Sequence, residues 1–374
     1  MTGVSNRNGW LTKPLIEVAT LQRGYDLPVQ DRTSGQYPIF AANGPVGFHG
    51  SAKCKGPGVV TGRSGTIGKV HFAEGDYWPL NTSLYVTDFH GNDPRWVYYM
   101  LQSFGLERFA QGAGVPTLNR NLIHGESINV PPIVEQRRIA AILDTADALR
   151  AKRREALLHL ARLGQSIFVE MFGDPIENHR NYPVSCLNDL VDENRPITYG
   201  ILMPGPDVED GVLYVRVVDM KNGGIELSGI RSTSREISNS YRRSLLKGGD
   251  LLMSIRGHVG RFAIIPPMLE GANITQDSAR LAVVGANPLY VRECLKTPGF
   301  QRWMAKHTKG VAVRGINLAD VKIMPIPVPE QRLQDEFAER IGAIETMQLS
   351  FREALDTGDK LFASLQHRAF RGEL

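Results

Sequence analysis

One segment of the chain carries acids and a lysine at a spacing that could support metal-dependent DNA cleavage. Asp207 precedes a β-type run that ends in Asp219 and Lys221. Two carboxylates can hold a divalent cation, and a nearby lysine can stabilise charge on a phosphate. The pattern is permissive, and no second acidic cluster in the sequence supports it. We therefore keep an autonomous metal-dependent DNA nuclease that uses these three residues as the alternative hypothesis.

Two other segments imitate catalytic motifs but lack residues that the chemistry needs. Residues 62–70 resemble a phosphate-binding loop, yet Arg63 replaces its first glycine and Val70 replaces the hydroxyl residue that reaches magnesium. Residues 287–290 resemble the base-gripping motif of adenine methyltransferases, but Leu289 replaces a proline and no cofactor-binding turn precedes it. The histidines do not cluster either. We predict no catalytic residues and no metal site, and interpret the chain as a binding protein.

Composition describes a globular protein with a small positive charge. The 374 residues are 42% hydrophobic and 22% charged, with a formal net charge of +4, and this length allows two or more domains. The three cysteines lie far apart, without the spacing of a zinc site or a disulfide framework. The amino end lacks a secretory signal and no apolar run is long enough for a bilayer, so we expect a cytoplasmic protein with no membrane partner.

Positive charge is densest between residues 292 and 314. This stretch holds six lysines and arginines against one glutamate. A solvated helix face and a phosphate-contacting surface explain such a run equally well. The six residues are Arg292, Lys296, Arg302, Lys306, Lys309 and Arg314.

Residues 132–172 predict one long helix with a coiled-coil seam. About 40 residues at 1.5 Å each would extend roughly 60 Å. Seam positions recur three and four residues apart. They are Ile139, Ile142, Ala146, Leu149, Arg153, Ala156, Leu160, Leu163, Ile167 and Glu170. An offset of 195 residues gives a second seam within 327–374, namely Gln334, Phe337, Ile341, Ile344, Gln348, Phe351, Leu355, Gly358, Phe362 and Leu365.

Two details of the paired seams carry predictions of their own. Arg153 and Gln348 take equivalent positions, and a polar layer there would fix the register of the helix pair at some cost in stability. The alternative is that Arg153 extends its charge out of the seam into solvent. Gly358 interrupts the second seam, and glycine destabilises a helix interior by about 1 kcal/mol. We therefore expect the second helix to kink or restart there.

The globular segments repeat as well. Residues 65–73 (GTIGKVHFA) parallel residues 257–265 (GHVGRFAII), and the Gly-rich loop 111–122 parallels 309–318. An internal repeat of about 195 residues, each a compact unit followed by a long helix, is the main architectural feature. It predicts an α/β (α+β) protein in which two long antiparallel coiled-coil helices separate two tandem globular domains with pseudo-two-fold symmetry.

The order and duplication of these motifs resemble the specificity subunits of type I restriction-modification systems. The resemblance rests on P-x-x-E-Q at 132–136, on its copy Pro-x-x-Glu-Gln at 327–331, on FGDP at 172–175, and on the turn and loop above. It implies target recognition domains at 1–131 and 173–326, each followed by a conserved spacer helix, at 132–172 and 327–374. It also implies no catalysis by this chain itself.

The resemblance further implies partners and DNA-contacting residues. Each recognition domain would read one half of a bipartite site in double-stranded DNA, and the helices would dock two methyltransferase (modification) subunits, which restriction subunits then join. S-adenosylmethionine, ATP and Mg²⁺ would bind these partners, and this chain would carry no cofactor. Because basic and polar side chains on turns supply phosphate and base contacts, we place DNA binding at Arg63, Ser64, Lys69, Asn119, Arg120, Arg256, His258, Arg261, Lys309 and Arg314.

Overall fold

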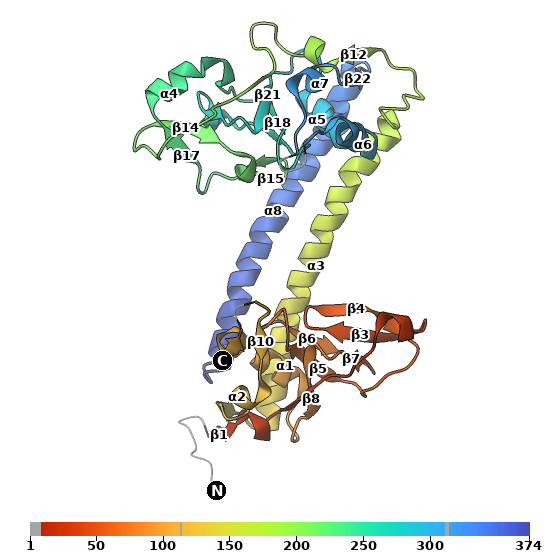
Figure 1. Cartoon of the computed structure of the whole chain (residues 1–374), viewed down its shortest axis with the longest axis vertical. Helices are drawn as coiled ribbons and strands as arrows, with labels where there is room; N and C mark the ends of the chain where they lie inside the picture. Colours follow the sequence, from red (N-terminus) through yellow and green to blue (C-terminus); the bar gives the residue numbers. More distant parts are fainter. Residues whose placement is uncertain (1–8, 113, 311–313) are drawn as a thin grey trace. The chain divides into compact units, whose positions relative to one another are not determined.

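The computed structural model describes residues 9–112, 114–310 and 314–374 and resolves into two compact units. Unit 1 comprises Met1–Glu155 with Arg352–Leu374, and unit 2 comprises Ala156–Phe351. The two longest helices, α3 (Ile133–Phe172, 40 residues) and α8 (Gln331–Ala369, 39 residues), each contribute a segment to both units. Figure 1 shows these helices and the strands and helices that surround their ends.

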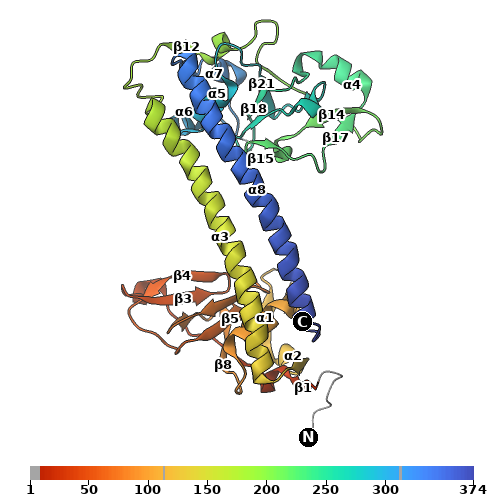
Figure 2. The ribbon, with the colours of Figure 1, turned by 180° about the vertical axis from the view of Figure 1, so that it is seen from behind.

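Unit 1 is built on small sheets around one end of each long helix (Figure 2). The main antiparallel sheet has the order β2 (Thr20–Arg23), β8 (Ser83–Asp88), β5 (Gly58–Gly62) and β6 (Val70–Ala73). A second sheet has the order β4 (Gly44–His49), β3 (Tyr37–Ala41) and β7 (Trp78–Pro79), with β3 and β7 parallel. The remaining elements are β1 (Leu11–Pro14) with β11 (Ser127–Val130), β9 (Ala110–Gln111) with β10 (Thr117–Leu118), and helices α1 (Pro94–Ser103) and α2 (Arg120–His124).

Unit 2 repeats this strand order in its four-stranded sheet, in its three-stranded sheet and in the two-stranded sheet that corresponds to β1 with β11. Its main sheet has the order β13 (Thr198–Tyr199), β21 (Ser278–Leu281), β18 (Leu251–Ser254) and β19 (Phe262–Ile264). Its second sheet has the order β17 (Arg231–Thr233), β14 (Val212–Val215) and β20 (Asn273–Ile274), again with one parallel pair. The other elements are β12 (Val184–Cys186) with β22 (Pro325–Pro327), β15 (Met220–Lys221) with β16 (Gly224–Ile225), and helices α4 (Arg235–Ser240), α5 (Pro288–Lys296), α6 (Pro298–His307) and α7 (Leu318–Lys322).

Equivalent local signals start the equivalent helices α1 and α5. The Asp93 side chain accepts hydrogen bonds from the first backbone N–H groups of α1, and the Asn287 side chain does the same for α5. A proline follows each cap, where its fixed φ suits the first helical turn. Each helix then packs an apolar face into the core of its own unit, including Trp96 in α1 and Tyr290 in α5. The prediction of two similar units with two long helices is confirmed, and NPLY is a capped helix start.

Two buried glutamines set the true offset between the long helices. Gln136 Oε1 accepts from Asp93 N at 2.8 Å, and Gln334 Oε1 accepts from Asn287 N at 2.8 Å. The amides also donate to the carbonyls of Pro131 (2.9 Å) and of the proline at 329 (2.7 Å). Each glutamine therefore ties a long helix to the start of α1 or α5. Because Gln334 follows Gln136 by 198 residues, the predicted helix offset of 195 is wrong by about one turn.

The corrected offset explains which side chains the helices bury. The ten seam positions predicted in α8 are all buried or half-buried. In α3, however, the predicted seam is wrong at Leu149, Leu163 and Glu170, all of which are exposed. An offset of 198 selects ten positions in α3 that are all buried or half-buried, namely Gln136, Ile139, Leu143, Ala146, Arg150, Arg153, Leu157, Leu160, Gly164 and Ile167.

Within each unit the two helix segments run antiparallel. In unit 1 Arg138 Nη2 donates to Leu374 O at 3.0 Å, and Arg150 Nε donates to Asp359 Oδ1 at 2.6 Å. In unit 2 the rings of Phe168 and Phe337 meet edge to face with centroids 5.4 Å apart. As the residue numbers rise along α3, the residue numbers of their contact partners in and after α8 fall, as antiparallel packing requires.

Gly358 does not interrupt α8, which is helical from Gln331 to Ala369. The expected kink is therefore wrong. A Cβ at Gly358 would lie 2.9 Å from Arg153 Nη1 and 3.6 Å from Arg150 Cγ. The glycine leaves room for two arginines that lie across the helix pair of unit 1, which offsets its low helix propensity.

Candidate nucleic-acid interface

In unit 1 the turn after β5 and the Gly-rich loop form one surface. Leu118 N donates to Arg63 O at 2.8 Å, and Gly65 N donates to Pro116 O at 2.9 Å. Ser64 and Thr117 form an isolated antiparallel bridge. The backbones of two segments more than 50 residues apart in sequence are thus hydrogen-bonded to each other as in neighbouring strands. We call residues 63–69 with 114–120 turn surface 1.

Unit 2 contains the corresponding arrangement. Ile316 N donates to Ile255 O at 2.9 Å, and Gly257 N donates to Arg314 O at 2.9 Å. Lys309 and Gly315 exchange both backbone hydrogen bonds, at 2.8 and 2.9 Å. We call residues 255–261 with 309–310 and 314–316 turn surface 2. Arg256 corresponds to Ser64, in agreement with the parallel of residues 65–73 with 257–265 in the sequence.

Each turn surface borders a shallow pocket. A pocket of about 400 Å³ in unit 1 is lined by residues that include Arg23, Arg63, Asn119 and Arg120. Two pockets of about 500 and 820 Å³ flank turn surface 2, with Arg314 at one, Arg256 and Lys309 at the other, and Gly310 at both. The structure therefore brings together, within each unit, most of the residues predicted to contact DNA. Four predicted residues lie on the turns but do not line these three pockets: Ser64, Lys69, His258 and Arg261.

Some predicted residues are partly committed to structure. Arg63 Nη1 donates to Asn81 O at 2.9 Å, and Arg120 Nη1 donates to Leu21 O at 3.4 Å. Asn119 Oδ1 caps α2 by accepting from Asn121 N at 3.0 Å. A side chain that satisfies the backbone in this way has less capacity for a ligand. These three residues therefore shape turn surface 1 as well as line its pocket.

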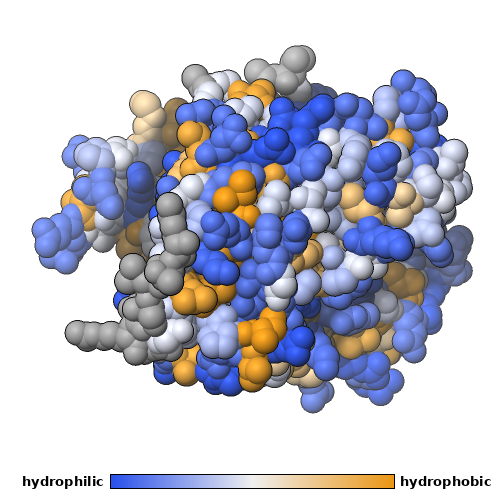
Figure 3. Space-filling model, turned by 90° about the horizontal axis from the view of Figure 1, so that it is seen from below, coloured by the Kyte–Doolittle hydropathy of each residue, from blue (hydrophilic) through white to orange (hydrophobic). Residues whose placement is uncertain are grey.

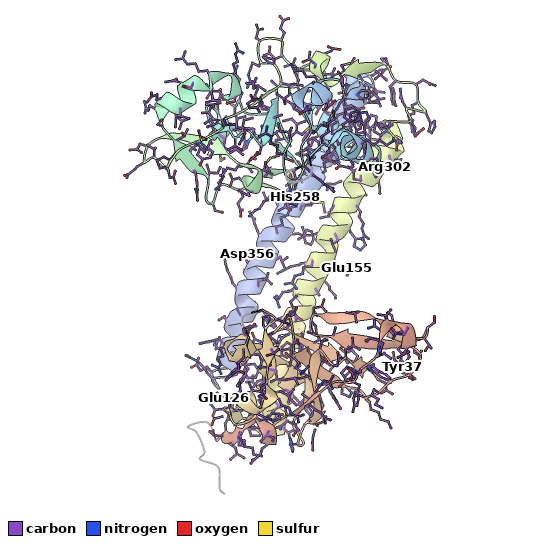
Figure 4. The ribbon with its side chains drawn as sticks, viewed as in Figure 1. Tyr37, Glu126, Glu155, His258, Arg302 and Asp356 are labelled. Carbon is purple, nitrogen blue, oxygen red and sulfur yellow. The ribbon has the colours of Figure 1, made fainter. Side chains whose placement is uncertain are left out.

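Other predicted side chains are exposed and point to solvent. Lys69, His258, Arg261, Lys309 and Arg314 are exposed, and no side-chain hydrogen bond or ion pair is found for them among the described residues. Figure 4 labels His258 on its turn in unit 2. Arg256 Nη1 is held by Gln276 Oε1 at 2.8 Å. Free cations on rigid turns can form salt-dependent phosphate contacts without breaking native bonds.

Sequence reasoning missed several residues of these pockets. Arg23 comes from β2 and also forms an ion pair with Asp26 at 3.1 Å. Tyr199, Gln276 and Asp277 line the larger pocket at turn surface 2. They lie far from the turns in sequence and form no motif. Only the strand order, which places β2 beside β8 and β13 beside β21, delivers them to the site.

Two cations of the basic run 292–314, Arg292 and Lys296, belong to a buried ion-pair network. Arg292 is only 1% exposed, with Nε 2.9 Å from Glu293 Oε1 and Nη2 2.5 Å from Glu345 Oε1. Lys296 Nζ lies 2.8 Å from the same Glu293 oxygen, and the exposed Arg302, labelled in Figure 4, lies 3.9 Å from Asp174. Burial would raise the pKa of Glu293, but the neighbouring cations outweigh it and lower that pKa. Phosphate contact is thus open to Lys306, Lys309 and Arg314, and closed to Arg292.

The nuclease alternative receives no support from the geometry. Asp207 Oδ1 accepts from Ser232 N at 2.7 Å and from its hydroxyl at 2.8 Å. Asp219 is 5% exposed and accepts two bonds from the Arg216 guanidinium, at 3.0 and 2.7 Å. Lys221 pairs with Glu226. Throughout the described residues, no three His, Cys, Asp or Glu side chains converge as metal ligands, and Asp219 serves instead to hold a turn.

The two register residues have different surroundings. Arg153 is half-buried and its Nη1 donates to Ala354 O at 2.5 Å, so it contacts α8 across unit 1. Gln348 is half-buried in unit 2. With the offset of 198 residues, Gln348 corresponds to Arg150, not to Arg153. The register role of Arg153 and Gln348 stays a prediction.

The His124 side chain makes the contact between α2 and β2 in unit 1 sensitive to acid. Its Nε2 accepts a hydrogen bond from Leu21 N at 3.1 Å, and burial followed by the Arg120 charge lowers the His124 pKa. The unfolded chain therefore binds this proton more readily, so the stabilisation is complete above about pH 6.5 and falls as the pH drops below that value. We expect a loss of about 1 kcal/mol, the value of one hydrogen bond.

Urea unfolding between pH 7.5 and 5.5 tests this expectation. His124→Gln should reduce the loss, and the remaining loss would include His71, whose pKa burial and Lys69 also lower. An equal pH dependence in the variant and the parent would show that His124 does not contribute.

Comparison with known proteins shows which proteins this chain resembles. Residues 7–159 match the family described as "Type I restriction modification DNA specificity domain". Over these residues the chain is similar to type I restriction specificity subunits. This confirms the resemblance inferred from the sequence motifs.

Individual relatives agree with this relationship. The Type I restriction enzyme EcoBI specificity subunit of Escherichia coli is 27% identical over 314 residues, which cover 75% of this chain and 65% of that subunit. The aligned part is therefore less than two thirds of the relative's own length. The relative is named as a specificity subunit of a restriction enzyme, which agrees with the prediction that this chain is not the catalytic part.

Solved structures support the fold over nearly the whole chain. The S subunit of a type I restriction-modification system from M. genitalium matches with a TM-score of 0.65 and 15% identity, covering 99% of both chains. A chain from a study of complex assembly and conformational transition of a type I R-M system matches with a TM-score of 0.55 and 15% identity, covering 98% of both. At this identity the likeness establishes the fold alone. No helix in the described ranges is long and apolar enough to cross a membrane.

Proposed function

We propose that this chain is the DNA-reading subunit of a type I restriction-modification enzyme. The observation that carries the proposal is the duplication of the turn surface, since each unit independently joins a basic turn to a Gly-rich loop. Two equivalent surfaces suit a split DNA target, one half for each unit. Hydrophilic residues predominate on the face drawn in Figure 3, with hydrophobic residues in small separate groups.

The proposal assigns chemistry to partners and recognition to this chain. Two methyltransferase subunits would dock on α3 and α8 and restriction subunits would join them. S-adenosylmethionine, ATP and Mg²⁺ would bind those subunits. The exposed cations of the turn surfaces would provide salt-dependent affinity for phosphates, whereas loop side chains in the pockets would read base edges.

Exchange of one unit's globular part tests modular recognition. Replacing residues 176–320 by the corresponding segment of another specificity subunit keeps α3 and α8, and so keeps the surfaces proposed for docking. We expect the assembled enzyme to methylate a site in which one half changes and the other is retained, because each turn surface belongs to one unit. Sequencing of methylated DNA gives the readout.

The reciprocal exchange in unit 1, residues 11–128, is the matched control and should change the other half. A change in both halves after a single exchange would contradict independent reading by the two units. Unaltered specificity after both exchanges would contradict DNA reading by this chain.

A further inference from the structure

A pocket in unit 2 gathers positive charge at some distance from turn surface 2. It has a volume of about 460 Å³ and is lined at the start of β18 by Leu246 and Lys247, whereas the turn follows the end of that strand. The ends of this four-residue strand are three steps of about 3.4 Å, roughly 10 Å, apart. The charged residues of its lining are Arg195, Arg242, Arg243, Lys247, Arg280 and a single acid, Glu270.

Arg280 places a buried guanidinium without a direct ion pair to any described residue in the wall of this pocket, and the carboxylates of Asp250 and Asp192 act on it from a longer distance. The residue is 3% exposed, its Nη1 donates to Leu245 O at 3.0 Å and its Nη2 donates to Pro196 O at 2.9 Å. Its buried Nε has no acceptor, and no carboxylate in the described part of the chain forms an ion pair with it. A buried charge without a counter-ion is costly. An anion in the pocket would reduce that cost.

The nearest acid of the core is already committed. Asp250 accepts from both Nη atoms of Arg195, at 2.8 and 2.6 Å, and from Lys247 N at 2.7 Å. Arg243 and Lys247 are exposed, and no side-chain partner is found for either among the described residues. Arg242 makes one long contact of 3.4 Å with Asn239. Three exposed cations therefore surround the pocket in addition to the buried guanidinium.

Unit 1 shows that the fold does not require this charge. In the main sheets Leu252 pairs with Arg280, and the equivalent Val60 pairs with Tyr85. The Tyr85 hydroxyl lies 2.8 Å from the hydroxyl of Tyr25, so unit 1 satisfies the same position with neutral groups. The charge of Arg280 is thus a feature of unit 2 alone at this sheet position, where its Nη atoms hold two backbone carbonyls and its Nε is left without an acceptor.

We propose that this pocket binds a phosphate group. Guanidinium groups match the paired oxygens of phosphate, and several of them together favour a doubly charged anion. The lining contains no aromatic side chain on which a base could stack, so the recognised group is the phosphate itself. It could belong to a DNA backbone or to a small free phosphate. This inference does not depend on the proposed reading of DNA by turn surface 2.

Thermal unfolding of the full chain tests the site. Sodium phosphate should raise the Tm more than sodium chloride of equal ionic strength, and pyrophosphate titration should give a measurable Kd. The double variant Arg242→Gln/Lys247→Gln changes only exposed side chains, so it should fold, lose most of the phosphate-specific rise and weaken pyrophosphate binding by about tenfold or more, as expected when charged hydrogen bonds are lost. Arg231→Gln/Arg235→Gln, at exposed positions outside the pocket lining, is the matched control and should behave as the parent does.

Two outcomes would overturn the site: an equal rise in Tm with chloride, or unchanged pyrophosphate binding by the double variant. Titration with a short duplex over a range of salt concentrations then separates the two sources. A shallower dependence of log K on log salt in the double variant identifies the DNA backbone as the source. An unchanged salt dependence together with weaker pyrophosphate binding identifies a free phosphate compound.

Discussion

Arg292→Met is expected to lower the free energy of unfolding by about 3 kcal/mol, because it leaves Glu293 buried with fewer cations. Arg292 joins two helices of unit 2 through Glu293 in α5 and Glu345 in α8, and Gln165 Nε2 in α3 donates to Glu293 Oε2 at 2.9 Å. Loss of one arginine therefore disturbs a network that reaches three helices. Urea unfolding followed by circular dichroism provides the measurement.

The nearby Arg302→Gln is the matched control. Arg302 is exposed and lies 3.9 Å from Asp174, and exposed pairs of this kind contribute about 0–1 kcal/mol. The double variant Arg292→Met/Glu293→Met removes both buried charges and should recover part of the lost stability. If Arg292→Met and Arg302→Gln had equal effects, the network would not be a stabilising element of unit 2.

Lys309→Gln/Arg314→Gln is expected to weaken DNA binding and to reduce its dependence on salt. Each phosphate contact contributes about 0.9 to the slope of log K against log salt, so the loss of two contacts should make that slope shallower by about 1.8. Both side chains are exposed on turn surface 2, and the hydrogen bonds that hold the surface together come from the backbone. Fluorescence anisotropy of the full chain with duplex DNA measures the slope.

Two further measurements keep this prediction specific. The Tm of Lys309→Gln/Arg314→Gln should stay close to that of the parent, which separates lost contact from lost folding. Arg231→Gln/Arg235→Gln in the same unit should leave the slope unchanged. An unaltered slope in the Lys309/Arg314 variant would contradict phosphate contact by turn surface 2.

Local signals in the sequence were sufficient for the main elements. The apolar period predicted α3 from 132 to 172, and the helix is observed from Ile133 to Phe172. Gly173, which follows the last helical residue, has a positive φ of 79°, and Pro175 comes two residues later. Such signals act between residues that are close in sequence, so they can be recognised without knowledge of the tertiary structure.

The offset between the long helices could not be read in this way. P-x-x-E-Q aligned Gln136 with Gln331, whereas the buried counterpart is Gln334 and Gln331 is exposed. Gln331 and Gln334 are the same residue type three positions apart, so the sequence does not show which of them corresponds to Gln136. Only the N–H group at the start of α5 selects one of them, because a buried amide must be satisfied and Gln334 alone reaches it.

The sequence by itself determined the duplication, the two long helices, the basic turns and the relationship to type I specificity subunits, because each depends on residue types at short spacing. Tertiary structure alone decided what each charge does. Arg292 is buried in an ion-pair network, Asp219 holds a turn, Arg280 lines a pocket rich in basic residues, and Lys309 and Arg314 are exposed. The reason is physical: the role of a charge depends on its burial and its partners, and strand order brings those partners from distant parts of the chain.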